Sequence, residues 1–120
     1  MGRSKLIETV PVAGGDYTVA RWDGGAQVLL AIHGITASHL AWPPVVDELA
    51  GDYTIYAPDL RGRGASNALP PPYGLGSHVA DLAALLDHHG VESAVLVGHS
   101  LGAYISLEFA AAHPARVRGL

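Results

Sequence analysis

A serine stands between two glycines where an apolar run of the chain gives way to a helical pattern. Residues 98–102 read GHSLG, with VLV before them and AYIS after them. A serine on so sharp a turn from strand to helix is exposed at the carboxyl end of a sheet, and flanking glycines let neighbouring backbone pass close by. The free N–H groups of the following helix favour a negative charge that develops on a substrate. The pattern predicts that Ser100 is a nucleophile.

The oxyanion formed by attack of such a serine needs hydrogen-bond donors already in place, and a second stretch offers one. The sequence AIHGIT places His33 and Gly34 directly after an apolar run. We therefore expect the backbone N–H groups of Ile35 and Leu101 to face each other across the carbonyl oxygen of a substrate. His33 is expected to hydrogen-bond within its own loop. The residues expected to line or support the pocket are His33, Gly34, Thr36 and His99.

The residues that follow Ser100 offer no general base for it. Glu108 and His113 fall on the helix that starts at the serine, roughly 12 Å and 20 Å away at 1.5 Å per residue. A general base must come within about 3 Å of the proton that it takes. The base, and the acid that orients it, are therefore expected from sequence outside residues 1–120.

The strands predicted from the pattern are of two kinds. Three short, nearly continuous apolar runs are typical of parallel strands covered on both faces. They are residues 27–34, 53–59 and 93–99. Residues 6–12 and 17–22, joined by the turn AGGD, predict an N-terminal antiparallel hairpin. RVRGL, at residues 116–120, is interpreted as the first part of a further strand.

Helical patterns separate these strands. They are residues 39–51, 77–90 and 101–113. The first is expected to place Trp42 in the core and to stop at Gly51. The second is expected to start at Ser77 as its N-cap and to stop at Gly90. Strands and helices alternate, which predicts an α/β fold with a doubly wound, mostly parallel sheet. The Gly- and Pro-rich residues 59–76 are expected to form the least regular loop.

Composition limits the class of protein. A chain of 120 residues with a formal net charge of −4 and 49% hydrophobic residues fits one globular domain. Since there is no cysteine, disulfides, thiolate metal sites and cysteine nucleophiles are excluded. Scattered basic residues argue against a nucleic-acid partner, and no His, Asp or Glu cluster has metal-ligand spacing. We expect no cofactor, no export signal and no membrane span. We expect a cytoplasmic location.

These motifs resemble the N-terminal half of an alpha/beta hydrolase. The resemblance rests on HG at residues 33–34, on APDLRGRGAS at residues 57–66 and on GHSLG at residues 98–102, in the order of that family. It implies Ser100 as the nucleophile, the two backbone donors named above as the oxyanion hole, and a sheet of strand order 1-2-4-3-5-6-7-8. It also implies a catalytic Asp or Glu, and then a catalytic His, after later strands.

The function implied by the resemblance is that of an esterase-like serine hydrolase, which acts on uncharged esters or related acyl compounds through an acyl-enzyme on Ser100. The subclass stays open among esterase, lactonase, peptidase, C–C bond hydrolase and acyltransferase. A serine where haloalkane dehalogenases have an aspartate argues against dehalogenation. The resemblance also places Asp59 in a structural loop, where Arg61 or backbone N–H groups satisfy its carboxylate.

Two hypotheses about the working unit follow from the missing base. In the first, residues 1–120 are the N-terminal part of a single enzyme domain, and a complementary C-terminal part supplies the remaining strands, the cap, the acid and the histidine. That part is a second polypeptide, a nicked product of the same chain or an omitted segment. In the second, the chain is a non-catalytic half-domain, a relic that acts in assembly or binding. In both, an apolar central strand is expected at an open sheet edge, which invites pairing with that polypeptide or with a second copy.

Overall fold

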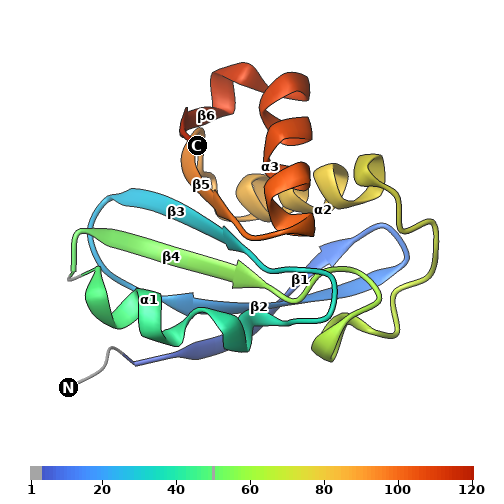
Figure 1. Ribbon diagram of the computed structural model, residues 1–120, viewed down its shortest axis with the longest axis horizontal. Helices are drawn as coiled ribbons and strands as arrows, with labels where there is room; N and C mark the ends of the chain where they lie inside the picture. Colours follow the sequence, from blue (N-terminus) through green and yellow to red (C-terminus); the bar gives the residue numbers. More distant parts are fainter. Residues whose placement is uncertain (1–3, 50) are drawn as a thin grey trace.

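The computed structural model describes residues 4–49 and 51–120, which form one six-stranded sheet in the order β1-β2-β4-β3-β5-β6 (Figure 1). The strands are β1 (Leu6–Val12), β2 (Gly15–Trp22), β3 (Gln27–Ile32), β4 (Tyr53–Pro58), β5 (Ala94–Gly98) and β6 (Val117–Gly119). β2 pairs antiparallel with β1 and with β4, and the other pairs are parallel. The predicted hairpin, the mostly parallel sheet and the strand order through β6 are confirmed.

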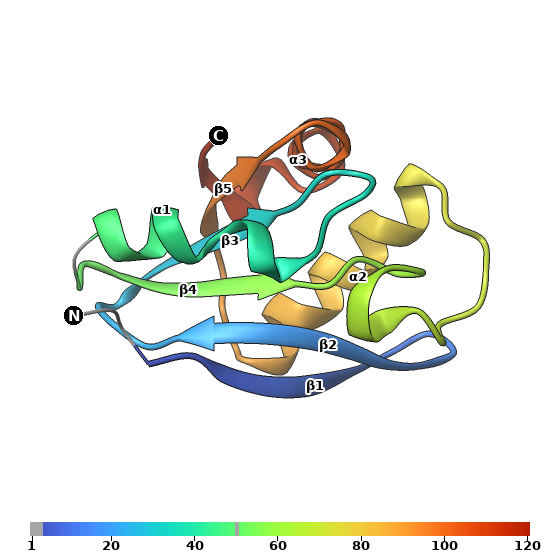
Figure 2. The same cartoon turned by 60° about the horizontal axis from the view of Figure 1, so that its bottom comes forward.

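Helices cover both faces of this sheet (Figures 1 and 2). They are α1 (Pro43–Glu48), α2 (Leu75–His88) and α3 (Leu101–Ala112). On one face, Leu29 and Ala31 of β3 belong to the same apolar cluster as Val46 of α1. On the other face, Leu30 and Ile32 cluster with residues of α2 and α3. Successive strand residues point to opposite faces, so a continuous apolar run fits a strand covered twice. The doubly wound fold is confirmed.

The first helical stretch is shorter than the predicted residues 39–51. A 3-10 turn at His39–Ala41 precedes α1, which begins at Pro43 and ends at Glu48. Two adjacent prolines lack N–H donors and cannot lie inside a helix, but they fit its first turn. The α-helix therefore starts at the prolines. Trp42 is buried between the two turns, as predicted.

The second helix starts earlier than predicted. α2 begins at Leu75 with Gly74 as its N-cap residue, so the assignment of Ser77 as the N-cap is wrong. The N–H groups of Ser77 and His78 both donate to the carbonyl of Gly74. A glycine N-cap is nearly as good as a serine, and the helix takes up Ser77 within its first turn.

The carboxyl ends of β3, β4 and β5 meet at one edge of the sheet. Leu30 of β3 is level with Tyr56 of β4 on one side and with Leu96 of β5 on the other. The loops that follow these strands therefore lie next to one another, as in other parallel α/β sheets. We call them the oxyanion loop (residues 33–39), the β4 loop (residues 59–66) and the elbow (residues 98–102).

The strand before Ser100 is not an edge strand. β5 pairs with β3 on one side and, through Ala94 and Val95, with Val117 and Gly119 of β6 on the other. The expectation of an apolar central strand at the open edge is corrected in part, because β6 covers the first two residues of β5. Among the described residues, the outermost strand on this side is the short β6.

Candidate active site

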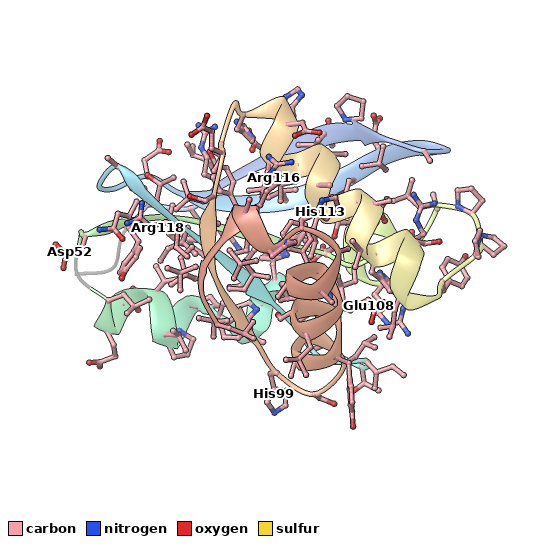
Figure 3. All side chains as sticks on the ribbon, turned by 90° about the horizontal axis from the view of Figure 1, so that it is seen from above. Asp52, His99, Glu108, His113, Arg116 and Arg118 are labelled. Atoms are coloured by element: carbon pink, nitrogen blue, oxygen red, sulfur yellow. The ribbon has the colours of Figure 1, made fainter. Side chains whose placement is uncertain are left out.

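Ser100 occupies the sharp turn between β5 and α3. It is the N-cap residue of α3, with φ of 57° and ψ of −118°. Among the described residues it is the one non-glycine with positive φ. Such a conformation costs about 1–3 kcal/mol and persists where the surrounding structure enforces it. Ser100 and His99 are both exposed, and Figure 3 shows His99 projecting from this turn. The predicted turn with an accessible serine is present.

Two glycines make this turn sterically possible. A Cβ on Gly98 would overlap the carbonyl oxygen of Gly102, and a Cβ on Gly102 would overlap that of Ile32 at the end of β3. The N–H of His99 donates to the same Ile32 carbonyl at 3.1 Å, which ties the elbow to the neighbouring strand. Contact with backbone on two sides therefore requires glycine at both positions, as the motif indicated.

The oxyanion loop lies against the elbow. A Cβ on Gly34 would sit 3.3 Å from Cβ of Ser100 and 3.3 Å from Nδ1 of His99. Ile35, the next residue, is 56% exposed. Within residues 4–49 and 51–120, neither the N–H of Ile35 nor that of Leu101 donates a hydrogen bond. The two amides expected as oxyanion donors are thus free, one beside the serine in sequence and one in the loop packed against it.

His33 is a buried support for the oxyanion loop. Because the N–H of Leu60 can only donate, Nε2 of His33 accepts it at 2.9 Å, and Nδ1–H donates to the carbonyl of Gly34 at 2.6 Å. Burial lowers the pKa of this imidazole below its ordinary value, which favours the neutral ring that both bonds require. The contact within the loop is confirmed, and the contact to Leu60 is new. Thr36, expected at the pocket, is exposed further along the loop.

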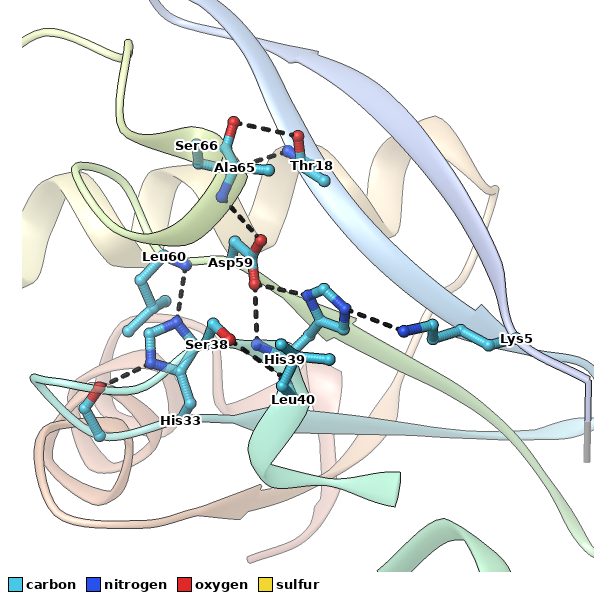
Figure 4. Close-up of polar contacts among 11 residues, drawn as sticks. Lys5, Thr18, His33, Ser38, His39, Leu40, Asp59, Leu60, Ala65 and Ser66 are labelled. Carbon is cyan, nitrogen blue, oxygen red and sulfur yellow. Dashed lines mark hydrogen bonds and ion pairs between the residues drawn. The ribbon is translucent and has the colours of Figure 1, made fainter. Parts of the chain in front are cut away.

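Asp59 joins the oxyanion loop to the β4 loop. Its Oδ1 accepts the N–H of His39 at 2.7 Å and the ring Nδ1–H at 2.8 Å, and its Oδ2 accepts the N–H of Ala65 at 2.9 Å (Figure 4). Burial raises the pKa of this carboxyl, but the hydrogen bonds from His39 and Ala65 outweigh burial and leave the pKa below its ordinary value. Backbone N–H groups thus satisfy Asp59, whereas Arg61 pairs with Asp81 at 2.8 Å.

The family model of the alpha/beta hydrolase fold matches residues 27–120. This chain belongs to the alpha/beta hydrolase family. The lipase LipV of Mycobacterium tuberculosis is 38% identical over 106 residues, which are 88% of this chain and 40% of the lipase. The 2-(acetamidomethylene)succinate hydrolase of Mesorhizobium japonicum is 35% identical over 100 residues, which are 83% of this chain and 36% of that hydrolase.

Solved structures share the arrangement of this alpha/beta hydrolase chain. An alpha/beta hydrolase from Novosphingobium aromaticivorans matches with a TM-score of 0.87 at 30% identity, over 98% of this chain and 42% of that one. An epoxide hydrolase from an endophytic Streptomyces matches with a TM-score of 0.83 at 30% identity, over 94% of this chain and 35% of the epoxide hydrolase. The chain therefore spans about two fifths of the length of these relatives. The resemblance inferred from the three motifs is confirmed.

The helix of this alpha/beta hydrolase chain that starts after Ser100 carries no general base for that serine. α3 runs from Leu101 to Ala112, and Figure 3 shows His99 at one end of it and His113 at the other. Glu108 lies part-way along. At a rise of 1.5 Å per residue, Glu108 lies roughly 12 Å and His113 roughly 20 Å from Ser100. Both distances are far beyond the reach of a general base.

A second histidine, His39, forms a pair with a carboxylate. Nδ1 of His39 bonds Asp59, while its Nε2 accepts from Nζ of Lys5 at 3.3 Å (Figure 4). With both ring nitrogens engaged, His39 cannot take a proton from Ser100 in this arrangement. The pair braces the end of the oxyanion loop.

Besides the bond from Leu60 to His33, two contacts that shape the site were not predicted from the sequence. His39 bonds Asp59 across a separation of 20 residues, and Nε of Arg63 donates to the carbonyl of Ile35 at 2.8 Å across 28. Neither pair follows a local spacing rule, because the partners meet only once β3 and β4 are paired. The local sequence around an Arg or His in a Gly-rich loop does not identify its hydrogen-bond partner.

Two further kinds of feature are absent from residues 4–49 and 51–120. No three His, Asp or Glu side chains gather in a way that could hold a metal ion. No helix there is long and apolar enough to cross a bilayer.

Proposed function

We propose that the chain carries the nucleophile and the oxyanion hole of a serine hydrolase. The observation that carries the proposal is Ser100 itself, which is exposed, held at positive φ and set at the N-terminus of α3. The free N–H of Leu101 follows it, and the loop with the free N–H of Ile35 packs against it. Relatives that include a lipase and the hydrolase of an acetamido compound support hydrolytic chemistry.

The proposed reaction proceeds through an acyl-enzyme. Oγ of Ser100 attacks the carbonyl carbon of an ester while its proton passes to a general base. The oxyanion accepts hydrogen bonds from the N–H groups of Ile35 and Leu101, and the positive end of the α3 dipole adds to its stabilisation. Collapse expels the alcohol, which receives the proton from the base. Water then attacks the acyl group by the same route, releases the carboxylic acid and restores the serine hydroxyl.

We propose that the base is a histidine oriented by an Asp or Glu, both supplied by a complementary polypeptide segment outside residues 1–120. The engaged rings of His33 and His39 support this part of the proposal. The substrates proposed are uncharged esters or related acyl compounds. Ile35 and Tyr104 are 56% and 67% exposed next to the serine and offer apolar contact to such groups.

Replacement of the nucleophile in the complete assembly tests the proposal. Ser100→Ala is expected to lower turnover of an aryl ester by about 10⁴-fold or more and to abolish labelling by a fluorophosphonate. Ser77→Ala, on α2 and away from the elbow, serves as the matched control and should keep both activities. Full turnover by Ser100→Ala would refute the mechanism. A wild-type assembly that is never labelled would favour the non-catalytic half-domain instead.

A further inference from the structure

We propose that Arg63 positions the Ile35 oxyanion donor, an inference that rests on the proposed function. Nε of Arg63 donates to the carbonyl oxygen of Ile35 at 2.8 Å. The N–H of Ile35 is free, while the carbonyl of the same residue is held from the β4 loop. Arg63 does not touch the reacting atoms in this scheme. It is a positioning residue that acts through Ile35.

Both peptide planes that flank the Cα of Ile35 are held in place. The carbonyl of the Gly34–Ile35 peptide accepts from Nδ1 of His33 at 2.6 Å and from the N–H of Ala37 at 3.2 Å. The carbonyl of the following peptide accepts from Arg63. The N–H of Ile35 belongs to the first of these planes, and φ and ψ of Ile35 couple it to the second. The bond from Arg63 therefore restrains the donor through the backbone of Ile35, and without the guanidinium the second plane is free to turn.

Arg63, whose guanidinium makes this contact, is itself held by hydrogen bonds to residues of the β4 loop, one of which, Arg61, is buried. The backbone N–H of Arg63 donates to the carbonyl of Leu60 at 2.8 Å, and Nη1 donates to the carbonyl of Arg61 at 3.1 Å. The side chain of Arg61 is in turn paired with Asp81 at 2.8 Å, and these side chains are 4% and 2% exposed. A donor held at two points along the β4 loop, one of them on the anchored Arg61, has little freedom to move away from Ile35.

The Arg63 contact differs from the other bonds that link these loops. The bonds from His33 to Leu60 and from His39 to Asp59 involve buried groups, whose loss costs stability. Arg63 is only half-buried, and its bond to Ile35 lies on the exposed side of the loop. Its removal should therefore change the geometry of the oxyanion donor while leaving folding nearly unchanged.

A pair of substitutions of matched length tests this role in the complete assembly. Arg63→Met keeps the length of the chain to the Nε position but places a methyl group there, whereas Arg63→Gln places an amide nitrogen there. Loss of one oxyanion donor costs about 10²–10³ in kcat, so a displaced donor in Arg63→Met should lower kcat for an aryl ester by about 10–100-fold. KM should stay within about twofold. Arg63→Gln should recover most of the lost kcat.

A control and a second readout separate the possible outcomes. Arg21→Met removes a charge on β2, where Arg21 pairs with Glu8 and Asp23, and should leave kcat unchanged. The rate of Ser100 labelling by a fluorophosphonate should fall in Arg63→Met in parallel with kcat, while its circular dichroism and melting temperature match those of the wild type. Labelled wild type with an unchanged kcat in Arg63→Met would overturn the inference alone. Failure of Arg63→Gln to restore kcat would also overturn it. An unlabelled wild type would overturn the proposed function, and this inference with it.

Discussion

The elbow and the oxyanion loop meet at Ser100, yet they are held in different ways. The elbow is held by backbone that touches backbone within a few residues and at the end of β3, which excludes a Cβ at Gly98 and Gly102. The oxyanion loop is held by side-chain hydrogen bonds with the β4 loop, across 20 to 28 residues of sequence. One half of the site depends on steric exclusion, and the other on a set of polar bonds.

This difference predicts how each half responds to mutation. A steric overlap with backbone cannot be relieved by the movement of one side chain, because the whole turn must move. A single hydrogen bond contributes about 0.5–1.5 kcal/mol, and up to about 3 kcal/mol when a charged group takes part. Substitutions in the elbow should therefore be severe, and those in the oxyanion loop should be graded.

The largest effect is expected at Gly102. A Cβ there would overlap the carbonyl of Ile32 and approach that of His33 at 2.8 Å. Gly102→Ala is expected to lower the free energy of unfolding by about 3–5 kcal/mol, measured by urea denaturation. Gly76→Ala is the matched control, because it lies in α2 with no heavy atom within 4 Å of its Cβ position. It should stabilise the protein by about 0.5–1 kcal/mol. A mild effect at Gly102 would contradict the steric account of the elbow.

An intermediate effect is expected at Asp59. Asp59→Asn removes the charge that three donors from His39 and Ala65 share, and should cost about 2 kcal/mol at neutral pH. The folded pKa of this carboxyl lies below its ordinary value. Its contribution to stability is therefore complete above the unfolded pKa of about 4 and is lost as the pH falls through the folded pKa.

The measurement for Asp59 is the urea midpoint between pH 7 and pH 3. The wild type should lose stability toward acid, and the difference between it and Asp59→Asn should shrink as the pH falls. Asp47→Asn, an exposed carboxylate on α1, is the control and should follow the wild type. A constant difference across this pH range would show that the charge of Asp59 is not what holds the two loops together.

The smallest effect is expected at Ser100 itself. Its positive φ stores strain of about 1–3 kcal/mol, which a glycine would relieve at an entropic cost of about 0.5–1 kcal/mol. Ser100→Gly should therefore be more stable than Ser100→Ala by about 1 kcal/mol in urea denaturation. At Ser77, inside α2, the order should reverse and alanine should be favoured. The same order at both positions would argue against backbone strain in the elbow.

The sequence predicted the fold because the periodicity of its apolar residues is a local property. The runs before His33, Asp59 and His99 are the strands β3, β4 and β5, and the sheet order follows the one implied by the family. The errors came where local rules compete. Pro43 and Pro44 interrupt a helical pattern, and Gly74 displaces Ser77 as a cap.

The sequence by itself determined the elbow, because its glycines and its serine are required by backbone contacts within a few residues and at the neighbouring strand. What the tertiary structure alone decided is the support of the oxyanion loop. The bonds of His33, His39 and Arg63 exist because parallel pairing of β3 with β4 brings two loops together. A hydrogen bond between distant residues has no characteristic sequence separation, so only the folded sheet reveals it.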